Sequence, residues 1–192
     1  MRVLLATNNA GKLREAREIL PEVEWLSLAD LPPLPAAIED GTSFEENARK
    51  KALHYGPLVG LPTVGEDSGL CVDALGGRPG VLSARYGGDV LDGERCRLLL
   101  AELEGVPEEQ RAASFRCCAA LVVAGEVRAI SHGEVRGRIL LEPAGSHGFG
   151  YDPVFLYPPL GRSFAALTLA EKNAVSHRRR ALQGLLPHLR KP

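Results

Sequence analysis

The chain has 192 residues, of which 45% are hydrophobic and 24% are charged, and its formal net charge is −1. This length predicts a single domain over residues 1–192 that buries about 70% of the surface of the unfolded chain. The near-neutral charge excludes a broad basic surface, so we expect no nucleic-acid partner and no anionic membrane partner. No apolar run approaches the ~18 residues of a membrane span. Residues 1–7 turn polar too soon for a signal peptide, and we therefore expect a cytoplasmic protein.

The four cysteines indicate a reducing compartment. Cys71, Cys96, Cys117 and Cys118 are too few for a disulfide scaffold and form no C-x-x-C pair. We expect buried thiols that behave as small hydrophobic side chains. Cys117 and Cys118 are adjacent, so on a strand their side chains would point to opposite faces.

Hydrophobic patterning predicts strands alternating with helices in the first third of the chain. A polar turn at 7–11 separates a buried strand from a helix that ends at Pro21. Ser43 and Glu46 form a capping-box signature at the start of the next helix. The expected elements are a strand at 3–6, the helix ending at Pro21, a strand at 23–28, a loop at 30–41 and a helix at 44–55.

The rest of the chain is expected to be richer in strands and glycine loops. Ser176 is a good N-cap candidate, and Pro187 is expected to stop the last helix. In chain order we expect apolar runs at 62–64 and 70–72 around an acidic turn at 65–69, a loop at 76–88 with a helical turn near 81–86, a helix at 93–103, a hairpin of 113–124 and 126–141, a loop at 142–152, a strand at 153–157, a helical turn from 168 and a helix at 177–186. These elements predict one mixed α/β body.

The turn after the first strand has a composition suited to phosphate. It contains Thr7, Asn8, Asn9, Ala10, Gly11 and Lys12. Free N–H groups at a helix N-terminus attract an anion, and a lysine adds a point charge. The turn is not a Walker A loop, because Ala6 and Leu13 replace the first glycine and the magnesium-binding hydroxyl. An ordinary polar connection between strand and helix remains the alternative.

A second candidate is the acidic segment Glu66-Asp67-Ser68-Gly69. Two acids after a buried strand are costly unless they pair with cations or bind one. Mg²⁺ takes a few carboxylate oxygens, and a carboxylate beside it can deprotonate water. Glu39, in the preceding loop, is a possible further ligand. Asp-Ser-Gly also favours a simple turn, which stays open, whereas a serine-hydrolase elbow is excluded because Glu66 and Leu70 replace its glycines.

Two distal segments have weaker signals. Residues 145–152 place three glycines around Phe149 and Tyr151, an arrangement that would let a flat base stack on Phe149. Residues 172–180 carry Lys172, His177, Arg178 and further arginines. A structural glycine turn and a solvated helix face are the plain alternatives for these two segments.

Together these segments resemble the Ham1-type inosine/xanthosine triphosphate pyrophosphatases. The resemblance runs from residue 3 to about 186, and its most specific blocks are residues 75–86 and 148–153. It implies an elongated, two-lobed mixed-sheet α/β fold with a nucleotide cleft between the lobes, usually in a homodimer. The implied reaction is Mg²⁺-assisted hydrolysis of non-standard purine nucleoside triphosphates (ITP, dITP, XTP) to the monophosphate and pyrophosphate.

The resemblance also implies a role for each candidate residue. Asp67 would be the general base and a magnesium ligand, Glu39 or Glu66 would help to hold the ion, and Lys51 would face the triphosphate. The nucleotide would contact Thr7, Asn8, Asn9, Ala10, Gly11, Lys12, Ser68, Phe149, Gly150, Tyr151, Asp152, Lys172, His177 and Arg178. The chain departs from the family in having Asn8 where glycine is frequent and Glu66 where many bacterial members have Asp.

Three other readings stay open from the sequence. A Maf-type pyrophosphatase would act on other nucleotides with a related fold, although the 148–152 block and Ser176-His177-Arg178 argue against it. A non-catalytic nucleotide sensor and an RNA-binding protein are the alternatives from different classes.

Overall fold

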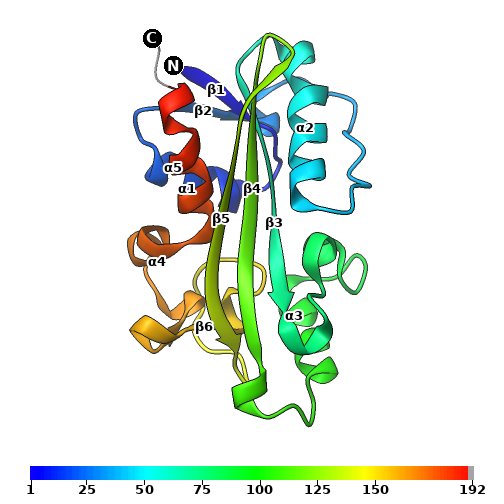
Figure 1. Ribbon diagram of the computed structural model, residues 1–192, viewed down its shortest axis with the longest axis vertical. Coiled ribbons are helices and arrows are strands. Elements are labelled where there is room, and N and C mark those ends of the chain that lie inside the picture. The colour runs from blue at the N-terminus through cyan, green and yellow to red at the C-terminus, as the bar shows by residue number, and fades with distance from the viewer. Residues whose placement is uncertain (190–192) are drawn as a thin grey trace.

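The computed structural model describes residues 1–189, and its long axis follows three long strands (Figure 1). A single sheet has the strand order β2-β1-β3-β4-β5-β6-β7. β1 pairs in parallel with β2 and β3, whereas the other pairs are antiparallel. The strands are β1 (Arg2–Leu5), β2 (Glu24–Ser27), β3 (Thr63–Val72), β4 (Ala112–Val123), β5 (Glu126–Ile139), β6 (Phe155–Tyr157) and β7 (Arg162–Ser163).

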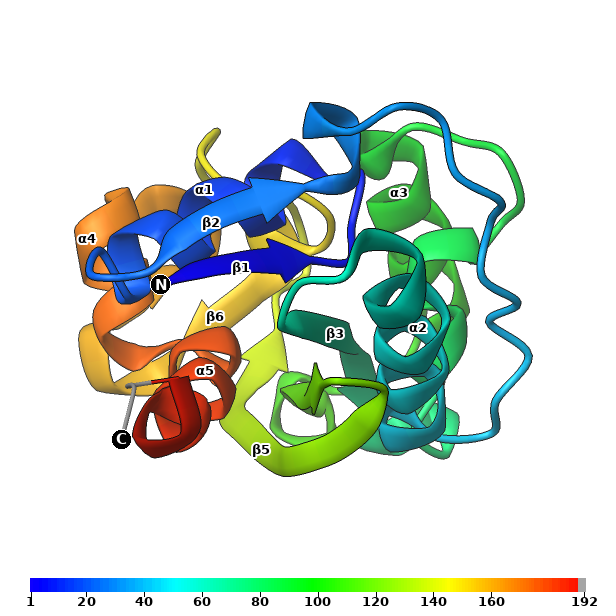
Figure 2. The same ribbon diagram turned by 90° about the horizontal axis from the view of Figure 1, so that it is seen from above.

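Helices cover both faces of the long strands. α2 packs on β3 and β4, and α5 packs on β5 and β4 from the other side, as the view from above shows (Figure 2). The helices are α1 (Ala10–Ile19), α2 (Phe44–Val59), α3 (Asp92–Glu102), α4 (Leu169–Val175) and α5 (His177–Leu189). Single 3-10 turns connect several elements, among them Gly80–Arg85, where a helical turn was expected near 81–86.

The apolar side chains form two main clusters at opposite ends of the long strands. One joins β1, α1 and α5 to β4 around Trp25 and Leu182. The other joins α3, β6 and the far ends of β3, β4 and β5 around Phe155 and Phe164. Each end therefore has its own core, and the elongated two-lobed mixed α/β fold expected from the sequence is confirmed.

Local capping signals predicted the helix starts correctly. The Ser43 hydroxyl accepts a hydrogen bond from Glu46 N at the start of α2. Thr168 and Glu171 form a full capping box at the start of α4, and Ser176 Oγ accepts a hydrogen bond from Arg179 N at the start of α5. The corner between α4 and α5 is therefore fixed by its own residues.

The predicted ends of α2 and α5 were wrong, because both helices continue through a proline. α2 includes Pro57 and ends only before Gly60, which is left-handed with φ 68°. α5 includes Pro187 and extends to Leu189, which is buried in the core around α1 and α5. A proline near a C-terminus removes one backbone hydrogen bond, and here the glycine cap and the burial of Leu189 offset that loss.

The acidic segment is not a turn. Residues 65–69 lie in the middle of β3, which pairs with β4 at every position from Thr63 to Val72. Gly65 serves close packing instead, since a Cβ there would lie 2.0 Å from the carbonyl oxygen of Ala48 in α2. Consecutive strand residues point to opposite faces, so Glu66 and Asp67 enter different environments.

All four cysteines are buried and unpaired, as expected. Cys117 belongs to the cluster with α1 and α5, and Cys118 to a small cluster with α2, so the two thiols do lie on opposite faces of β4. Within residues 1–189, every helix is too short or too polar to span a membrane.

Candidate active site

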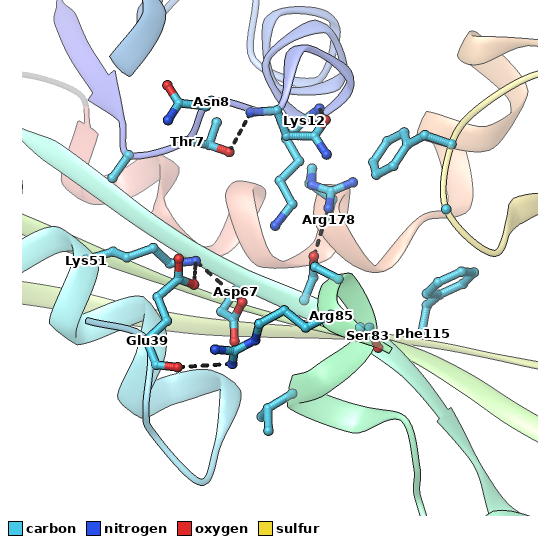
Figure 3. Close-up of a pocket in the computed structure, with 18 of the residues that line it drawn as sticks. Thr7, Asn8, Lys12, Glu39, Lys51, Asp67, Ser83, Arg85, Phe115 and Arg178 are labelled. Atoms are coloured by element: carbon cyan, nitrogen blue, oxygen red, sulfur yellow. Dashed lines mark hydrogen bonds and ion pairs between the residues drawn. The ribbon is translucent and has the colours of Figure 1, made fainter. Parts of the chain in front are cut away.

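A cavity of about 530 Å³ opens between the two ends of the molecule. Its walls come from the β1–α1 loop, α2, β3, residues 81–95, the loop around Phe149 and the α4–α5 corner. Thr7, Asn8 and Lys12 lie on one side of it, facing Lys51, Glu39 and Asp67 on another (Figure 3). Segments far apart in the sequence thus converge on one cavity.

Most of the residues expected at a site line this cavity. They are Thr7, Asn8, Asn9, Lys12, Glu39, Lys51, Asp67, Ser68, Phe149, Gly150, Tyr151, Asp152, Lys172, His177 and Arg178. Ala10, Gly11 and Glu66 are not among the lining residues. Ala10 and Gly11 form the first turn of α1, and Gly11 lies against Phe149: a Cβ there would be 2.7 Å from the ring.

The β1–α1 loop is held in shape by its own side chains. Asn9 is the N-cap of α1, and its Oδ1 accepts a hydrogen bond from Lys12 N at 3.1 Å. Thr7 Oγ1 accepts from Asn9 N at 3.1 Å. The first turn of α1 retains N–H groups without intrahelical partners, and the helix dipole favours negative charge there.

Asp67 is a buried carboxylate held by two neighbours, Asn47 and Lys51. Asn47 Nδ2 donates to its Oδ2 at 3.2 Å, and Lys51 Nζ lies 3.4 Å from its Oδ1 and 2.7 Å from Oε2 of Glu39. Burial raises the pKa of Asp67, although Lys51 opposes that shift. The cavity therefore contains a carboxylate with increased proton affinity, the property that a general base needs.

Glu66 points to the other face of β3 and lies among cations. Its carboxylate accepts from Arg178 Nη2 at 3.0 Å and lies 2.6 Å from Lys12 Nζ. Burial alone would raise the pKa of Glu66, but Arg178 and Lys12 hold it well below its usual range. The sequence left Glu39 or Glu66 as the further magnesium ligand, and the structure places Glu66 in an ion-pair network behind the cavity.

Glu15 supports the site from behind the cavity, and the sequence did not reveal it. It is 1% exposed, and its carboxylate pairs with Lys172 Nζ at 2.8 Å and with Arg178. Its pKa is lowered to about 2, because Arg178 and Lys172 outweigh the effect of burial. The signal was its position four residues before Ile19, which places a charge beside the apolar face of α1.

Phe149 covers the cations of the α4–α5 corner. Lys172 Nζ lies 4.8 Å from the centroid of its ring and 2.5 Å from Oδ2 of Asp152. The same Asp152 oxygen accepts from Phe149 N at 2.9 Å, and burial raises the pKa of this carboxyl. One carboxylate thereby fixes both the glycine loop and the lysine beside it.

His177 is a buried, neutral ring at the wall of the cavity. It stacks on Phe115 with centroids 4.9 Å apart and planes 11° from parallel. Burial, together with Arg178, lowers its pKa well below the usual value. Nδ1 is buried and has no hydrogen-bond partner within residues 1–189.

Three further lining residues come from segments that carried no predicted role. Arg85 Nη2 donates to the Glu39 carbonyl at 3.0 Å and so ties residues 80–85 to the loop before α2. Asp92 Oδ2 accepts from Gly150 N at 2.7 Å, and Arg95 also lines the cavity. Both contacts join segments at least 46 residues apart, which no local pattern indicates.

Comparison with known proteins gives one consistent result over nearly the whole chain. Residues 3–188 match the model of the Ham1 family. A dITP/XTP pyrophosphatase of Geobacter sulfurreducens is 51% identical over 98% of this chain and 96% of its own length. One from Gloeobacter violaceus is also 51% identical, over 96% of this chain and 92% of its own.

Solved structures agree with this relationship. A HAM1 protein from Coxiella burnetii superposes with a TM-score of 0.85 at 40% identity, covering 98% of both chains. The Staphylococcus aureus Ham1 protein gives 0.86 at 34% identity, again over 98% of both. The family match, the identities and the shared fold lead to one conclusion: the chain belongs to the Ham1 family.

Proposed function

We propose that this protein hydrolyses the triphosphates of non-standard purine nucleosides, namely ITP, dITP and XTP, to the monophosphate and pyrophosphate. Relatives with about half of their residues in common are dITP/XTP pyrophosphatases. The observation that carries the proposal is the cavity itself. It joins an anion-binding helix start and two lysines to a buried carboxylate of raised pKa.

The triphosphate belongs at the end of the cavity formed by the β1–α1 loop and α2. Lys12 and Lys51 supply compact positive charges there, and the loop N–H groups supply donors. Phosphoryl chemistry needs positioning and charge stabilisation from the protein more than covalent catalysis. This inventory supports phosphate binding without a Walker A motif.

Asp67 is the proposed general base. It accepts a proton from a water molecule as that water attacks the α-phosphorus, and the bond from the α-phosphorus to the bridging oxygen of pyrophosphate breaks. Lys51 and Lys12 balance the charge that develops on the departing pyrophosphate. Asn47 holds the second carboxylate oxygen of Asp67, so the first oxygen is aimed toward Lys51 and the cavity.

Magnesium is the proposed cofactor, and the acids of the cavity suit it. Glu39 and Asp67 offer carboxylate oxygens to the cavity, whereas Glu66 is already paired with two cations. A buried Asp67 whose nearest lysine is 3.4 Å away gains from another cation. When bound, Mg²⁺ would neutralise phosphate charge. We expect a chelator to abolish turnover and added Mg²⁺ to restore it; full activity in the chelator would contradict this.

The base is proposed to bind at the α4–α5 corner under Phe149. Hypoxanthine and xanthine present a 6-keto acceptor, whereas adenine presents a 6-amino donor. His177 lines the cavity as a neutral ring, and its one ring N–H can donate to the former. A site built on such hydrogen bonds discriminates strongly, because a mismatched base leaves buried polar groups unpaired.

A panel of triphosphates tests the proposed function. We expect ITP, dITP and XTP to release pyrophosphate, and no orthophosphate, with an efficiency far above that for ATP. GTP has the same 6-keto group as ITP and differs by its 2-amino group. The rate of GTP hydrolysis relative to ITP hydrolysis therefore measures how strongly the site disfavours the 2-amino group. Comparable efficiency on ATP would overturn the proposed base recognition. Binding without turnover would favour a sensor, and salt-dependent RNA binding without turnover would favour an RNA-binding protein.

Lys51→Arg is expected to lower kcat/KM by roughly 10- to 100-fold, because small displacements of a positioning group are costly. Lys51 is 7% exposed and contacts both Glu39 and Asp67, so a planar guanidinium cannot replace its compact ammonium. Lys50→Arg is the matched control, since Lys50 is exposed and pairs only with Asp40 in this structure. Equal rates for the two variants would remove Lys51 from the proposed role.

Gly11→Ala is expected to lower kcat/KM by about tenfold or more through Phe149. The new methyl group would meet the ring at 2.7 Å and push it away from Lys172 and the base site. Gly93→Ala in α3 is the control, because a Cβ there meets no atom within 4 Å. Steady-state kinetics with dITP compares them, and an unchanged kcat/KM in Gly11→Ala would contradict the argument.

A cytoplasmic location and a homodimer complete the proposal. The four free, buried cysteines favour a reducing compartment. Sedimentation equilibrium tests the dimer, with an expected mass of twice the 20.6 kDa of one chain. A mass of 20.6 kDa at micromolar concentration would reject it.

A further inference from the structure

A second group of metal-ligating side chains lies outside the active-site cavity. Glu45, Cys118 and His132 each offer one ligand atom, and these atoms all lie within 4.8 Å of one another. They come from the first turn of α2, from β4 and from β5. The set combines a carboxylate, a thiol and an imidazole.

The fold brings these three side chains together by sheet register. Cys118 and His132 are directly opposite each other on β4 and β5, so they share the face that α2 covers. Glu45 reaches this face from α2, and its Oε2 lies 3.3 Å from Nε2 of His132. The register also places Asp67 opposite Cys118, so Asp67, Cys118 and His132 form a row across three strands.

This cluster opens to a hollow of its own. The hollow has a volume of about 740 Å³, and its lining shares no residue with the active-site cavity. Cys118 is fully buried, whereas the side chains of Glu45 and His132 are 41% and 63% exposed. An ion that enters from solvent would therefore contact Glu45 and His132 before it reaches the thiol of Cys118.

The ligand chemistry selects the ion. Cysteine sulfur, histidine nitrogen and a carboxylate oxygen are the ligands of Zn²⁺, whereas Mg²⁺ prefers oxygen alone. We propose that Glu45, Cys118 and His132 form a Zn²⁺ site with a fourth position open to water or another ligand. It is separate from the magnesium proposed at Glu39 and Asp67, because it uses other residues and another opening.

Cobalt titration tests the site directly. Co²⁺ bound to a thiolate gives an intense charge-transfer absorption that oxygen and nitrogen ligands do not give. We expect one equivalent of Co²⁺ to produce this band and one equivalent of Zn²⁺ to remove it, while Mg²⁺ leaves it unchanged. Burial raises the pKa of the Cys118 thiol to about 12, so the ion displaces a proton and the titration belongs in mildly alkaline buffer.

Variants assign the band to these residues. Cys118→Ser should abolish it, and Cys71→Ser, which alters another buried free thiol, should not. His132→Ala and Glu45→Gln change exposed side chains and should weaken Co²⁺ binding. Loss of a residue that only supports a metal ligand costs roughly 10- to 100-fold in affinity, and loss of a ligand should cost at least as much. His54→Ala, outside the cluster, is their control.

The outcome of the cobalt titration does not depend on the proposed enzymatic function. Asp67→Asn should retain the cobalt band even if turnover is lost, and the band needs no nucleotide. A missing band in the wild type would overturn the zinc site and leave the pyrophosphatase proposal intact. If His132→Ala and Glu45→Gln keep the band and bind Co²⁺ with wild-type affinity, the assignment of these two residues as ligands would be overturned.

Discussion

Asp67→Asn is expected to lower kcat for dITP by about 10²–10⁴-fold, the usual contribution of a general base, while the protein remains folded. The substitution keeps the size of the side chain and removes its negative charge, and with it the ability to accept a proton from water. Asp40→Asn is the matched control, because Asp40 also pairs with a lysine but is largely exposed. Wild-type turnover in Asp67→Asn would exclude Asp67 as the base.

The pH profile gives this prediction a second readout. Protonated Asp67 cannot act as the base, so turnover should fall as pH drops through the pKa of Asp67 in the Mg²⁺-loaded enzyme. In the metal-free protein, burial raises the pKa of Asp67 above its ordinary value of 3.8. The pH dependence of folding stability that Asp67 contributes is opposite to that of an acid whose pKa is lowered by a salt bridge. The folded state binds the proton more tightly than the unfolded one, so ionising Asp67 costs stability as pH rises through this window. We therefore expect Asp67→Asn to keep its thermal midpoint at neutral pH, and a large drop would indicate a structural role.

Features coded by neighbouring residues could be predicted from the sequence. The start of α2 follows from Ser43 and Glu46, and the corner before α5 follows from Ser176, because caps act within one helical turn. The turn between β1 and α1 could be predicted for the same reason, since its cap Asn9 acts on Lys12 three residues later.

Features that depend on distant partners could not be predicted. A turn was predicted for residues 65–69 because the glycines and Asp67 favour one locally. In the structure β4 pairs with this segment along its full length. The ion pairs of Glu66 could not be predicted, because its cations, Lys12 and Arg178, are 54 and 112 residues away in the chain. Only the folded chain shows that adjacent acids of β3 have different partners.

Glu15→Gln is expected to lower the free energy of unfolding at pH 7 by about 3–5 kcal/mol, the cost of breaking a buried ion pair. The buried network contains three cations and three anions: Lys12, Lys172 and Arg178 against Glu15, Glu66 and Asp152. Removing one negative charge leaves the network with an uncompensated positive charge. Glu24→Gln, at an exposed pair with Arg2, is the control and should cost less than about 1 kcal/mol.

The pH dependence separates this charge effect from a packing defect. The pKa of Glu15 is lowered from 4.5 to about 2, so its contribution is complete above pH 4.5 and is lost as pH falls toward 2. Denaturant unfolding at several pH values should therefore show wild type and Glu15→Gln converging between pH 4.5 and 2. A difference that stayed constant over this range would point to packing. Because Glu15 also orients Lys172 and Arg178, the variant should raise KM for dITP at neutral pH, where both cations still line the cavity.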